Sequence, residues 1–470
     1  MSRFLLAHLV SMLASGLTFV LLVKVLRDRR PPASTLAWGL VIVLVPYVGI
    51  PLYLLLGGTW TRSVIGSKGR LFADVPAGPD GVPFVPDRAL PVARVLLSRG
   101  APPPRPGNEV EVCPSGEVAY RRLMDMIRGA RRRVAAMTFI LGRDEVGRAV
   151  VEALAAKARE GVEVYLLLDA LGCLGTRGRF VEPLRRAGGR VGVFLPVLPI
   201  HRRWSSNLRN HRKVAVVDDE TAWVGGMNLA TEYMGPTPRP DRWADVVAVV
   251  RGPAARDLAA VFAADWRFAT GRDIAPLPPE PGEPEGPAGA RATVQVVASG
   301  PDVEGGAILD ALLAAIMAAR ERVWIASPYF VPDEALTRAL ALQARMGRDV
   351  RILVPARSNH RLADLARGAP LRTVVEGGAR AFLYGPGMLH SKLTVVDDSV
   401  AFLGSANADM RSLYLNFEIG VLTYSPAEVA AVARVLEHYM AAGQGIDPAA
   451  GRHPFRWLLE DTARLLSPLL

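Results

Sequence analysis

The sequence contains almost no cysteine. Only two of its 470 residues are cysteine, Cys113 and Cys173. Neither has a partner at the spacing of zinc ligands, so a cysteine-based zinc site is excluded and a disulfide framework is not indicated. No acidic cluster with metal-ligand spacing is evident in the sequence. We therefore expect a site that uses no metal and no cofactor.

Lysine and histidine are also scarce, although the chain is strongly basic. Five of the 56 basic residues are lysine, seven residues are histidine, and the net charge is +11. A basic surface favours an anionic partner, either phospholipid headgroups or nucleic acid. An arginine-rich genome would give the same surplus, so the charge by itself selects no partner.

The first 60 residues hold two long apolar runs, 4–23 and 35–57. At ~1.5 Å per residue in a helix, each run could cross the ~30 Å hydrocarbon core of a bilayer. Neither run has a polar face, which disfavours soluble helices. The first run also lacks a small-residue cleavage site, which disfavours a signal peptide. We predict a transmembrane hairpin over 1–60 and a multi-pass protein of the bacterial inner (plasma) membrane. Basic residues between the runs and after the second leave its topology open.

Two stretches rich in proline and glycine divide the rest of the chain. We interpret 61–107 and 276–289 as linkers, which leaves two domains at 108–275 and 290–470. Each domain has the element order strand, helix, strand, which indicates α/β layers around a parallel or mixed sheet. The expected elements are strand 133–141, helix 145–160 and strand 162–169, then strand 322–330, helix 333–346 and strand 349–354.

One motif occurs in both domains, with the pattern H-x-K-x4-D-x6-G-(G/S)-x-N. The first copy runs over 211–228 and the second over 390–407, so 179 residues separate every matched pair. Two of the seven histidines and two of the five lysines occupy matched positions. A repeat of this length and composition is a strong sign of a functional site. The candidate catalytic residues are His211, Lys213, Asp218, His390, Lys392 and Asp397.

The motif suits phosphodiester exchange. Residues i and i+2 of an extended segment point to the same face, so each histidine projects together with its lysine. If a pseudo-twofold brings the two pairs together, one histidine can attack phosphorus while the other protonates the departing alkoxide. The lysines would stabilise the non-bridging oxygens, a role that otherwise needs a metal. The candidate phosphate-binding residues are Asn228, Asn407 and Ser405.

Carboxylates near the motif have two distinct predicted roles. A histidine nucleophile needs its second nitrogen held by a carboxylate or carbonyl, and Asp245 and Glu418 lie downstream in the two domains as candidates for orienting the histidines. Asp218 and Asp397 lie inside the motif. They are either part of the catalytic set or structural residues that bind backbone in the turn after each strand.

The doubled motif resembles the signature of the phospholipase D superfamily, and nearly the whole chain is similar to bacterial cardiolipin synthases. The stretches that carry the likeness are 46–57, 327–330, 388–392, 404–407 and 415–418. The resemblance implies two phospholipase D-like α/β domains related by pseudo-twofold symmetry. It also implies transfer of a phosphatidyl group between two phosphatidylglycerol molecules, with His211 as nucleophile and His390 as acid and base. One departure is Gly226, where the second copy has Ser405.

Other functions share this pocket. A hydrolytic phospholipase D differs mainly in how well water competes with alcohol, and a nuclease of the same superfamily could bind nucleic-acid phosphate with residues just before the first motif. Those residues are Arg202, Arg203, Trp204 and Arg209. The apolar hairpin favours anionic membrane lipids over nucleic acid as the partner, and intact motifs disfavour a scaffold without activity. The oligomeric state is unknown.

The remaining histidines and the carboxyl terminus have simple interpretations. His8 is a tolerated polar residue of the first run, His201 a loop residue near basic side chains, and His360, His438 and His453 are surface residues. The segment 455–470 either lies on the bilayer or packs on its own domain.

Overall fold

The computed structural model describes residues 3–27, 32–56, 68, 84–196, 208–278, 291–303, 306–446 and 454–465. The chain forms two compact units, Met1–Ser67 with Val197–Leu208, and Lys68–Pro196 with Arg209–Leu470. The predicted linker 276–289 lies largely outside the described residues, as do Arg202, Arg203, Trp204, His201 and His453.

The N-terminal unit contains the helices α1 (Arg3–Arg27), α2 (Pro32–Leu44) and α3 (Pro46–Leu56). The second predicted span is thus two helices, because Pro46 disfavours helical backbone at Val45 and cannot donate a helical hydrogen bond. Trp38 packs edge-on against Tyr53, with ring centroids 5.4 Å apart. Among the described residues, no helix is both long enough and apolar enough to cross a membrane.

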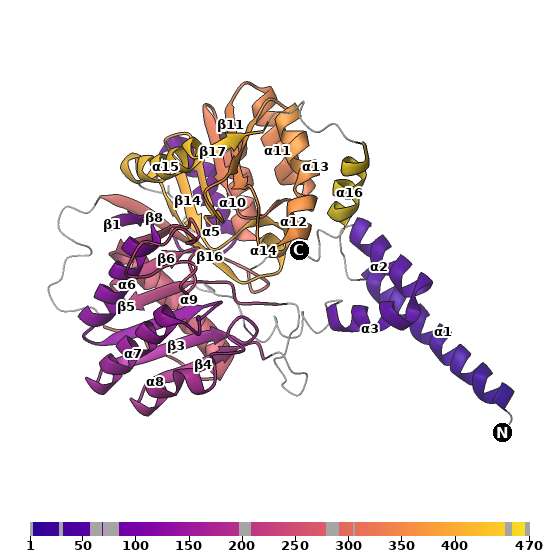
Figure 1. The fold of residues 1–470 in the computed structure, drawn as a ribbon, viewed down its shortest axis with the longest axis horizontal. Helices are drawn as coiled ribbons and strands as arrows, with labels where there is room; N and C mark the ends of the chain where they lie inside the picture. Colours follow the sequence, from indigo (N-terminus) through magenta and orange to yellow (C-terminus); the bar gives the residue numbers. More distant parts are fainter. Residues whose placement is uncertain are drawn as a thin grey trace. The chain divides into compact units, whose positions relative to one another are not determined.

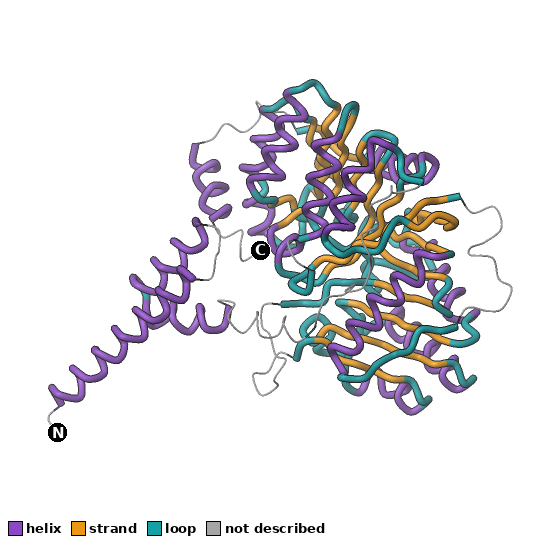
Figure 2. Tube along the Cα trace, turned by 180° about the vertical axis from the view of Figure 1, so that it is seen from behind, coloured by secondary structure: helices purple, strands orange, loops and turns teal. Residues whose placement is uncertain are grey.

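The second unit is built on one mixed sheet. In its described part 15 strands follow the order β17-β12-β11-β9-β13-β14-β16-β8-β1-β7-β6-β5-β2-β3-β4. Figure 1 shows this sheet running through both halves, and Figure 2 shows helices covering it. An α/β fold with two domains is therefore confirmed.

The elements of the first half alternate between strand and helix. Its strands are β1 (Arg105–Cys113), β2 (Arg133–Thr138), β3 (Glu163–Asp169), β4 (Arg190–Phe194), β5 (Val214–Val217), β6 (Thr221–Gly225) and β7 (Val247–Arg251). Its helices are α6 (Gly116–Gly129), α7 (Glu145–Arg159), η2 (Arg179–Val181), α8 (Glu182–Arg186) and α9 (Pro253–Thr270).

The second half repeats this plan. Its strands are β8 (Ala292–Ser299), β9 (Arg322–Ala326), β10 (Phe330–Val331), β11 (Asp349–Pro355), β12 (Arg380–Tyr384), β13 (Leu393–Val396), β14 (Val400–Gly404), β15 (Ala408–Asp409), β16 (Glu418–Thr423) and β17 (Gly443–Gly445). Its helices are α10 (Ala307–Ala318), α11 (Glu334–Arg345), α12 (Arg361–Ala366), α13 (Gly368–Glu376), α14 (Met410–Tyr414), α15 (Pro426–Ala441) and α16 (Pro454–Leu465). The six elements expected from the sequence correspond to β2, α7, β3, β9, α11 and β11.

The strand order is symmetric about the seam between the halves. β1 and β8 pair antiparallel at that seam, and the strands then follow outward in corresponding order on each side. In both halves an antiparallel pair carries the motif, β5 with β6 and β13 with β14. Three parallel strands lie beyond each pair, β2, β3 and β4 in the first half and β9, β11 and β12 in the second. The motif copies thereby occupy equivalent positions, each near the middle of its own half of the sheet.

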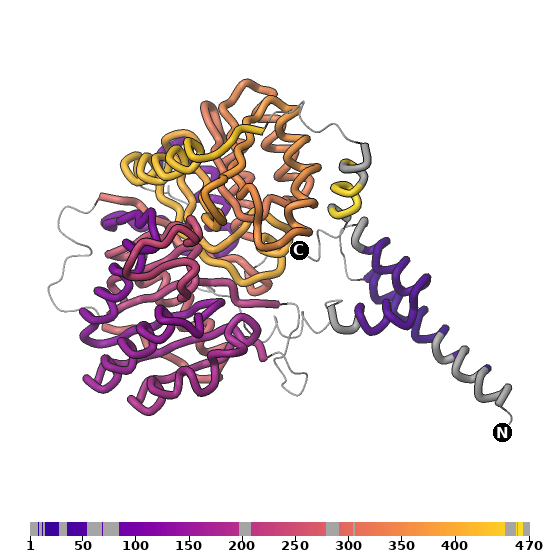
Figure 3. The backbone as a smooth tube through the Cα atoms, in the orientation of Figure 1, coloured from indigo at the N-terminus to yellow at the C-terminus, as the bar shows by residue number. Residues whose placement is uncertain are grey.

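The predicted linker 61–107 is wrong over its second part. Residues 87–98 form η1 (Asp87–Ala89) and α5 (Leu90–Ser98), and the buried side chains of Val92, Ala93 and Leu96 join the hydrophobic core of the second half. Figure 3 shows residues 87–98 among segments from the second half of the chain. Apolar positions at helical spacing, hidden between proline-rich stretches, explain why the helix forms here.

The C-terminal helix α16 packs on its own half, which is one of the two alternatives considered for this segment. Ala463 is buried against Val331 and Ala366, and Glu460 pairs with Arg372 on α13.

Candidate active site

Each H-x-K segment lies immediately before a central strand. His211 and Lys213 precede β5, and His390 and Lys392 precede β13. Strands β2 and β9 lie beside them and end early, because Thr138 Oγ1 and Ser327 Oγ donate to the carbonyls of Ile140 and Tyr329 at 2.8 Å. The chain after each of these strands leaves the sheet and forms a wall of the pocket.

The motif segments are joined across the two halves by backbone hydrogen bonds. His211 N donates to Phe417 O at 2.9 Å, and Phe417 N donates to Arg209 O at 3.0 Å. In the symmetric position, Ala244 N donates to Met388 O and His390 N donates to Ala244 O, both at 2.8 Å. Each histidine is therefore fixed beside the residue that precedes the carboxylate of the other half.

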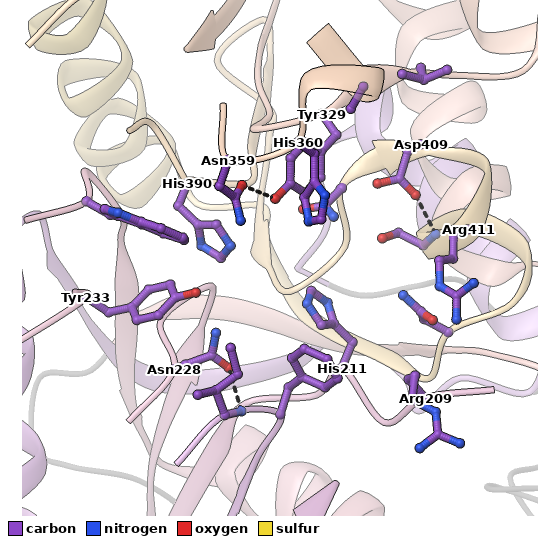
Figure 4. A pocket seen from close by; sticks show the side chains of 18 residues that line it. Arg209, His211, Asn228, Tyr233, Tyr329, Asn359, His360, His390, Asp409 and Arg411 are labelled. Carbon is purple, nitrogen blue, oxygen red and sulfur yellow. Dashed lines mark hydrogen bonds between the residues drawn. The ribbon is translucent and has the colours of Figure 1, made fainter. Parts of the chain in front are cut away.

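These bridges produce two crossed histidine–carboxylate pairs. His211 Nδ1 lies 3.0 and 3.1 Å from the two carboxylate oxygens of Glu418. His390 Nδ1 lies 2.6 Å from Asp245 Oδ2. With Nδ1 engaged by a carboxylate, the reactive nitrogen of each ring becomes Nε2. Figure 4 shows His211 and His390 in one pocket, on opposite sides of it.

Both motif lysines are buried and face the histidines. Lys213 Nζ donates to His211 O at 2.6 Å. Lys392 Nζ lies 3.1 Å from His390 Nε2 and 3.9 Å from Asp245 Oδ2. Burial lowers the pKa of Lys213 to about 7 and that of Lys392 to about 8. The neighbouring carboxylates thus compensate the two ammonium groups only in part, a condition that favours an anionic ligand.

The pKa values of the histidines and of their carboxylates are shifted in different directions. Burial lowers the pKa of His211, and burial together with Lys392 and Lys213 lowers that of His390 well below its usual value. Burial raises the pKa of Asp245 to about 6. Burial also acts to raise the pKa of Glu418, but His211, Lys213 and Ser405 outweigh it, so the net shift is downward.

Ser405 and Gly226 explain part of this difference between the two carboxylates. Ser405 Oγ donates to Glu418 Oε2 at 2.5 Å and accepts from Ile419 N at 3.0 Å. The matched Gly226 packs directly on Asp245: an added Cβ would lie 2.4 Å from Asp245 Oδ1. Ser405 is fully buried and lies outside the pocket lining, so its predicted contact with phosphate is corrected to a contact with Glu418.

A cavity of about 370 Å³ opens between the two histidines. Asn228 and Asn407 both line it, as expected for phosphate-binding residues. Asn228 Oδ1 accepts from Ile140 N at 3.1 Å, which directs the amide nitrogen elsewhere. Among the described residues, Asn407 Oδ1 has no hydrogen-bond partner.

Asp218 and Asp397 do not reach the pocket. Asp218 accepts from the backbone nitrogens of residues 131–133, and Asp397 accepts from those of residues 320–322, at 2.8 to 3.3 Å. Both occupy left-handed turns, with φ of 56° and 51°. They hold the start of β2 and β9 against the hairpin that carries the motif, so the catalytic interpretation is corrected to the structural one.

Sequence reasoning missed most of the pocket wall. His360 is exposed, as predicted, and it also lines the cavity, where its ring stands edge-on to Tyr329 with centroids 5.4 Å apart. Tyr329 Oη in turn donates to Asn359 Oδ1 at 2.6 Å. Other lining residues are Tyr233, Trp243, Asp409, Arg411, Ser412 and Asn416. Trp243 and Asn416 each lie two residues before a carboxylate, a signal that could have identified them.

Metal chemistry has no candidate ligand set in the described part of the chain. No group of three or more histidine, cysteine, aspartate or glutamate side chains is arranged there to hold an ion. Cys113 and Cys173 are free thiols, and both are buried. Metal independence stays a prediction.

We predict that Gly226→Ser displaces the Asp245 carboxylate, because the added Cβ overlaps Asp245 Oδ1. Overpacking at a filled site costs about 1–3 kcal/mol, measurable as a lower free energy of unfolding in denaturant. The ring nitrogens of His390 should shift in an NMR spectrum. Gly129→Ser is the matched control, since nothing lies within 4 Å of its added Cβ. Unchanged stability and an unchanged His390 ring in Gly226→Ser would contradict the close packing.

Two family models match the chain. The model described as "Cardiolipin synthase, PLD-like domain" matches residues 123–266 and 312–440, one match in each half. The model described as "Phospholipase D-nuclease N-terminal" matches residues 16–58, within the N-terminal unit.

Relatives and one solved structure agree with these matches. The chain is 33% identical to a cardiolipin synthase of Geobacillus kaustophilus, over 98% of this chain and 93% of the relative. It is 35% identical to cardiolipin synthase A of Pseudomonas aeruginosa, over 97% and 94%. The fold is similar to that of phosphatidylserine synthase from Haemophilus influenzae, with a TM-score of 0.59, 16% identity, and coverage of 81% of this chain and 100% of that one. From the doubled motif, the two matched domains and relatives that extend over nearly its full length, the chain belongs to the cardiolipin synthase family of phospholipase D-like proteins.

Proposed function

We propose that the protein is a cardiolipin synthase that transfers a phosphatidyl group from one phosphatidylglycerol molecule to the free hydroxyl of a second and releases glycerol. The observation that carries this proposal is the pair of crossed histidine–carboxylate contacts around one cavity. Such a site offers a nucleophile and a separate proton carrier, which are the two groups that a covalent phosphoryl-type transfer needs.

In the first step, His211 Nε2 attacks phosphorus and forms a P–N bond while the bond from phosphorus to the glycerol oxygen breaks. His390 gives its proton to the departing alkoxide, and glycerol leaves. Glu418 holds Nδ1–H of His211 and stabilises the positive charge on that ring. The assignment of His211 rather than His390 as nucleophile follows the family resemblance.

His390 must carry a proton at the start of that step, although burial and the two lysines lower its pKa. A bound phosphodiester adds a negative charge beside the imidazole and partly cancels the field of the two lysines. Both changes favour the protonated ring. Substrate binding therefore prepares the acid that the reaction uses.

In the second step, the hydroxyl of the second phosphatidylglycerol attacks phosphorus and gives its proton to His390. The P–N bond breaks, His211 is restored, and cardiolipin is the product. Asn228 and Asn407, which line the cavity, would contact the non-bridging oxygens in both steps, whereas Lys213 and Lys392, which are buried and lie outside the lining, would act through their charge. If water attacks instead, the product is phosphatidic acid, and the protein is a hydrolytic phospholipase D.

We further propose that the N-terminal helices anchor the protein in the bacterial inner membrane as a multi-pass hairpin. The apolar runs 4–23 and 35–57, together with the matched N-terminal family model, support this proposal. Phospholipid substrates reside in the same bilayer, so an anchored enzyme needs no soluble lipid carrier.

The product test supplies detergent-solubilised protein with phosphatidylglycerol as sole lipid, in the presence of a metal chelator, and identifies products by mass spectrometry. We expect cardiolipin and glycerol. His211→Ala and His390→Ala should each lower the rate at least about a thousandfold, because each removes a group that acts in the transition state. His438→Ala is the control, since His438 is exposed on α15. Phosphatidic acid as the sole product would mean that water is the acceptor.

The pH dependence of kcat/KM should be bell-shaped. The value of kcat/KM should fall below pH 6. Asp245 has a pKa of about 6, so it becomes protonated there, and His390 loses the negative charge beside its Nδ1. The value should fall again as pH rises through about 7 to 8, because Lys213 and Lys392 lose the charge that binds phosphate. In Asp245→Asn the acid limb should disappear from the residual activity. An acid limb that stays near pH 6 in this variant would assign it to another group.

The membrane proposal predicts that the full-length protein stays with the membrane pellet after an alkaline carbonate wash. Peripheral proteins are released by this treatment, whereas a spanning hairpin is retained by the hydrocarbon core. Recovery of the protein in the supernatant would contradict a multi-pass anchor.

A further inference from the structure

The two sides of the pocket differ in chemistry despite the symmetry of the fold. On the His390 side lie two aromatic rings, Tyr233 and Trp243, with centroids 5.0 and 5.3 Å from the imidazole. On the His211 side lie the guanidinium groups of Arg209 and Arg411, as Figure 4 shows. One side is thus apolar and the other is cationic.

The difference lies in positions that the repeat makes equivalent. The 179-residue offset that relates the motif copies pairs Arg411 with Glu232, and Arg209 with Met388. The same offset pairs Ser412 with Tyr233. The repeated motif alone therefore does not account for the two arginines, which are a feature of the His211 side only.

Both arginine side chains carry their charge in a buried wall of the cavity, where removal from water is costly. The Arg209 side chain is 3% exposed and lies 3.5 Å from Asp169. Burial lowers the pKa of both arginines. For Arg411, the Asp409 carboxylate opposes this decrease and the positive charge of Arg209 adds to it. Two like charges in one buried wall favour a ligand of opposite sign.

Further polar atoms on the same wall are available for hydrogen bonds. Among the described residues, Ser412 Oγ and Asn416 Oδ1 have no hydrogen-bond partner, although these residues are only 1% and 6% exposed. Both residues line the cavity. Asp409 Oδ1 accepts from Ser412 N at 2.7 Å and so fixes the turn that presents Arg411 and Ser412. Buried polar groups of this kind usually find a partner in the bound state.

We propose that Arg209 and Arg411 form a second phosphate subsite, which holds the phosphodiester of the acceptor lipid while the acceptor's free hydroxyl reaches the phosphorus on His211. This inference rests on the proposed function. Phosphatidylglycerol as acceptor carries its own phosphodiester monoanion, three carbons away from its terminal hydroxyl. Water and simple alcohols carry no such charge, so the subsite favours transfer to an anionic lipid over hydrolysis.

A competition between acceptors tests the subsite. The full-length enzyme receives phosphatidylglycerol in detergent micelles together with a fixed concentration of ethanol, and cardiolipin and phosphatidylethanol are quantified in the same reaction. Both products arise from the same phosphohistidine, so their ratio reports the acceptor step alone. In Arg411→Gln we expect the ratio of cardiolipin to phosphatidylethanol to fall about tenfold or more, as for loss of a charge-assisted contact to phosphate. Arg411→Lys, which keeps the charge but loses the planar fork, should give an intermediate ratio.

Arg338→Gln is the matched control. Arg338 lies on α11 with 81% of its side chain exposed and pairs only loosely with Glu334, at 3.8 Å. Its ratio should equal that of the wild type. Thermal unfolding of each variant shows whether it is folded, and Arg411→Lys carries the test if Arg411→Gln is not.

Two failures are distinguishable. If the wild type forms phosphatidylethanol but no cardiolipin, the proposed function is wrong and the subsite is overturned with it. If the wild type forms cardiolipin and the variants form both products in the wild-type ratio, the subsite alone is overturned, even if their total rate is lower. In that case Arg411 would act on the reacting phosphate rather than on the acceptor.

Discussion

The active pocket depends on four backbone hydrogen bonds that cross between the halves of the catalytic unit. They pair the segment before His211 with Phe417, and the segment before His390 with Ala244. Because the residue after Phe417 is Glu418 and the residue after Ala244 is Asp245, the bridges set the positions of both histidines together with the carboxylates that contact them. The histidine–carboxylate contacts of 2.6 to 3.1 Å therefore follow from main-chain pairing. Paired main chain has less conformational freedom than a rotating side chain.

A buried charge cluster supports the first of these bridges from behind. Arg212, the residue between His211 and Lys213, donates to Glu418 O at 3.0 Å and to Asp265 Oδ1 at 2.6 Å. Asp302 and Lys68 complete the cluster, with Lys68 Nζ 2.6 Å from Asp302 Oδ2 and 4.4 Å from the ring centroid of Phe417. Two cations and two anions balance here. Loss of one partner would leave a buried charge uncompensated, at a cost of about 3–5 kcal/mol.

The sequence predicted the repeat and the residues within it, but it could not predict how the two copies engage each other. Spacing alone identified His211, His390 and their lysines, and it brought Asp245 and Glu418 into consideration. It could not reveal that each carboxylate contacts the histidine of the opposite half, because that pairing is set by distant backbone. Nor can spacing separate a pocket residue from a turn residue, so it leaves Asp218 and Asp397 either catalytic or structural. The packing of α5 in the second half's core was equally hidden, since its partners follow more than 200 residues later.

The crossed pairing also limits how such a molecule can arise. A single half would hold a histidine and a carboxylate that cannot reach each other, so the smallest working ancestor is two identical copies meeting about a twofold axis. Gene duplication and fusion into one chain would preserve every crossed contact, while freeing each copy to change alone. Arg411 corresponds to Glu232 in the repeat, and Ser405 corresponds to Gly226. These are positions at which the two copies have diverged. Symmetry explains the paired histidine–carboxylate contacts, and its loss outside the motif gives the two sides of the cavity different chemistry.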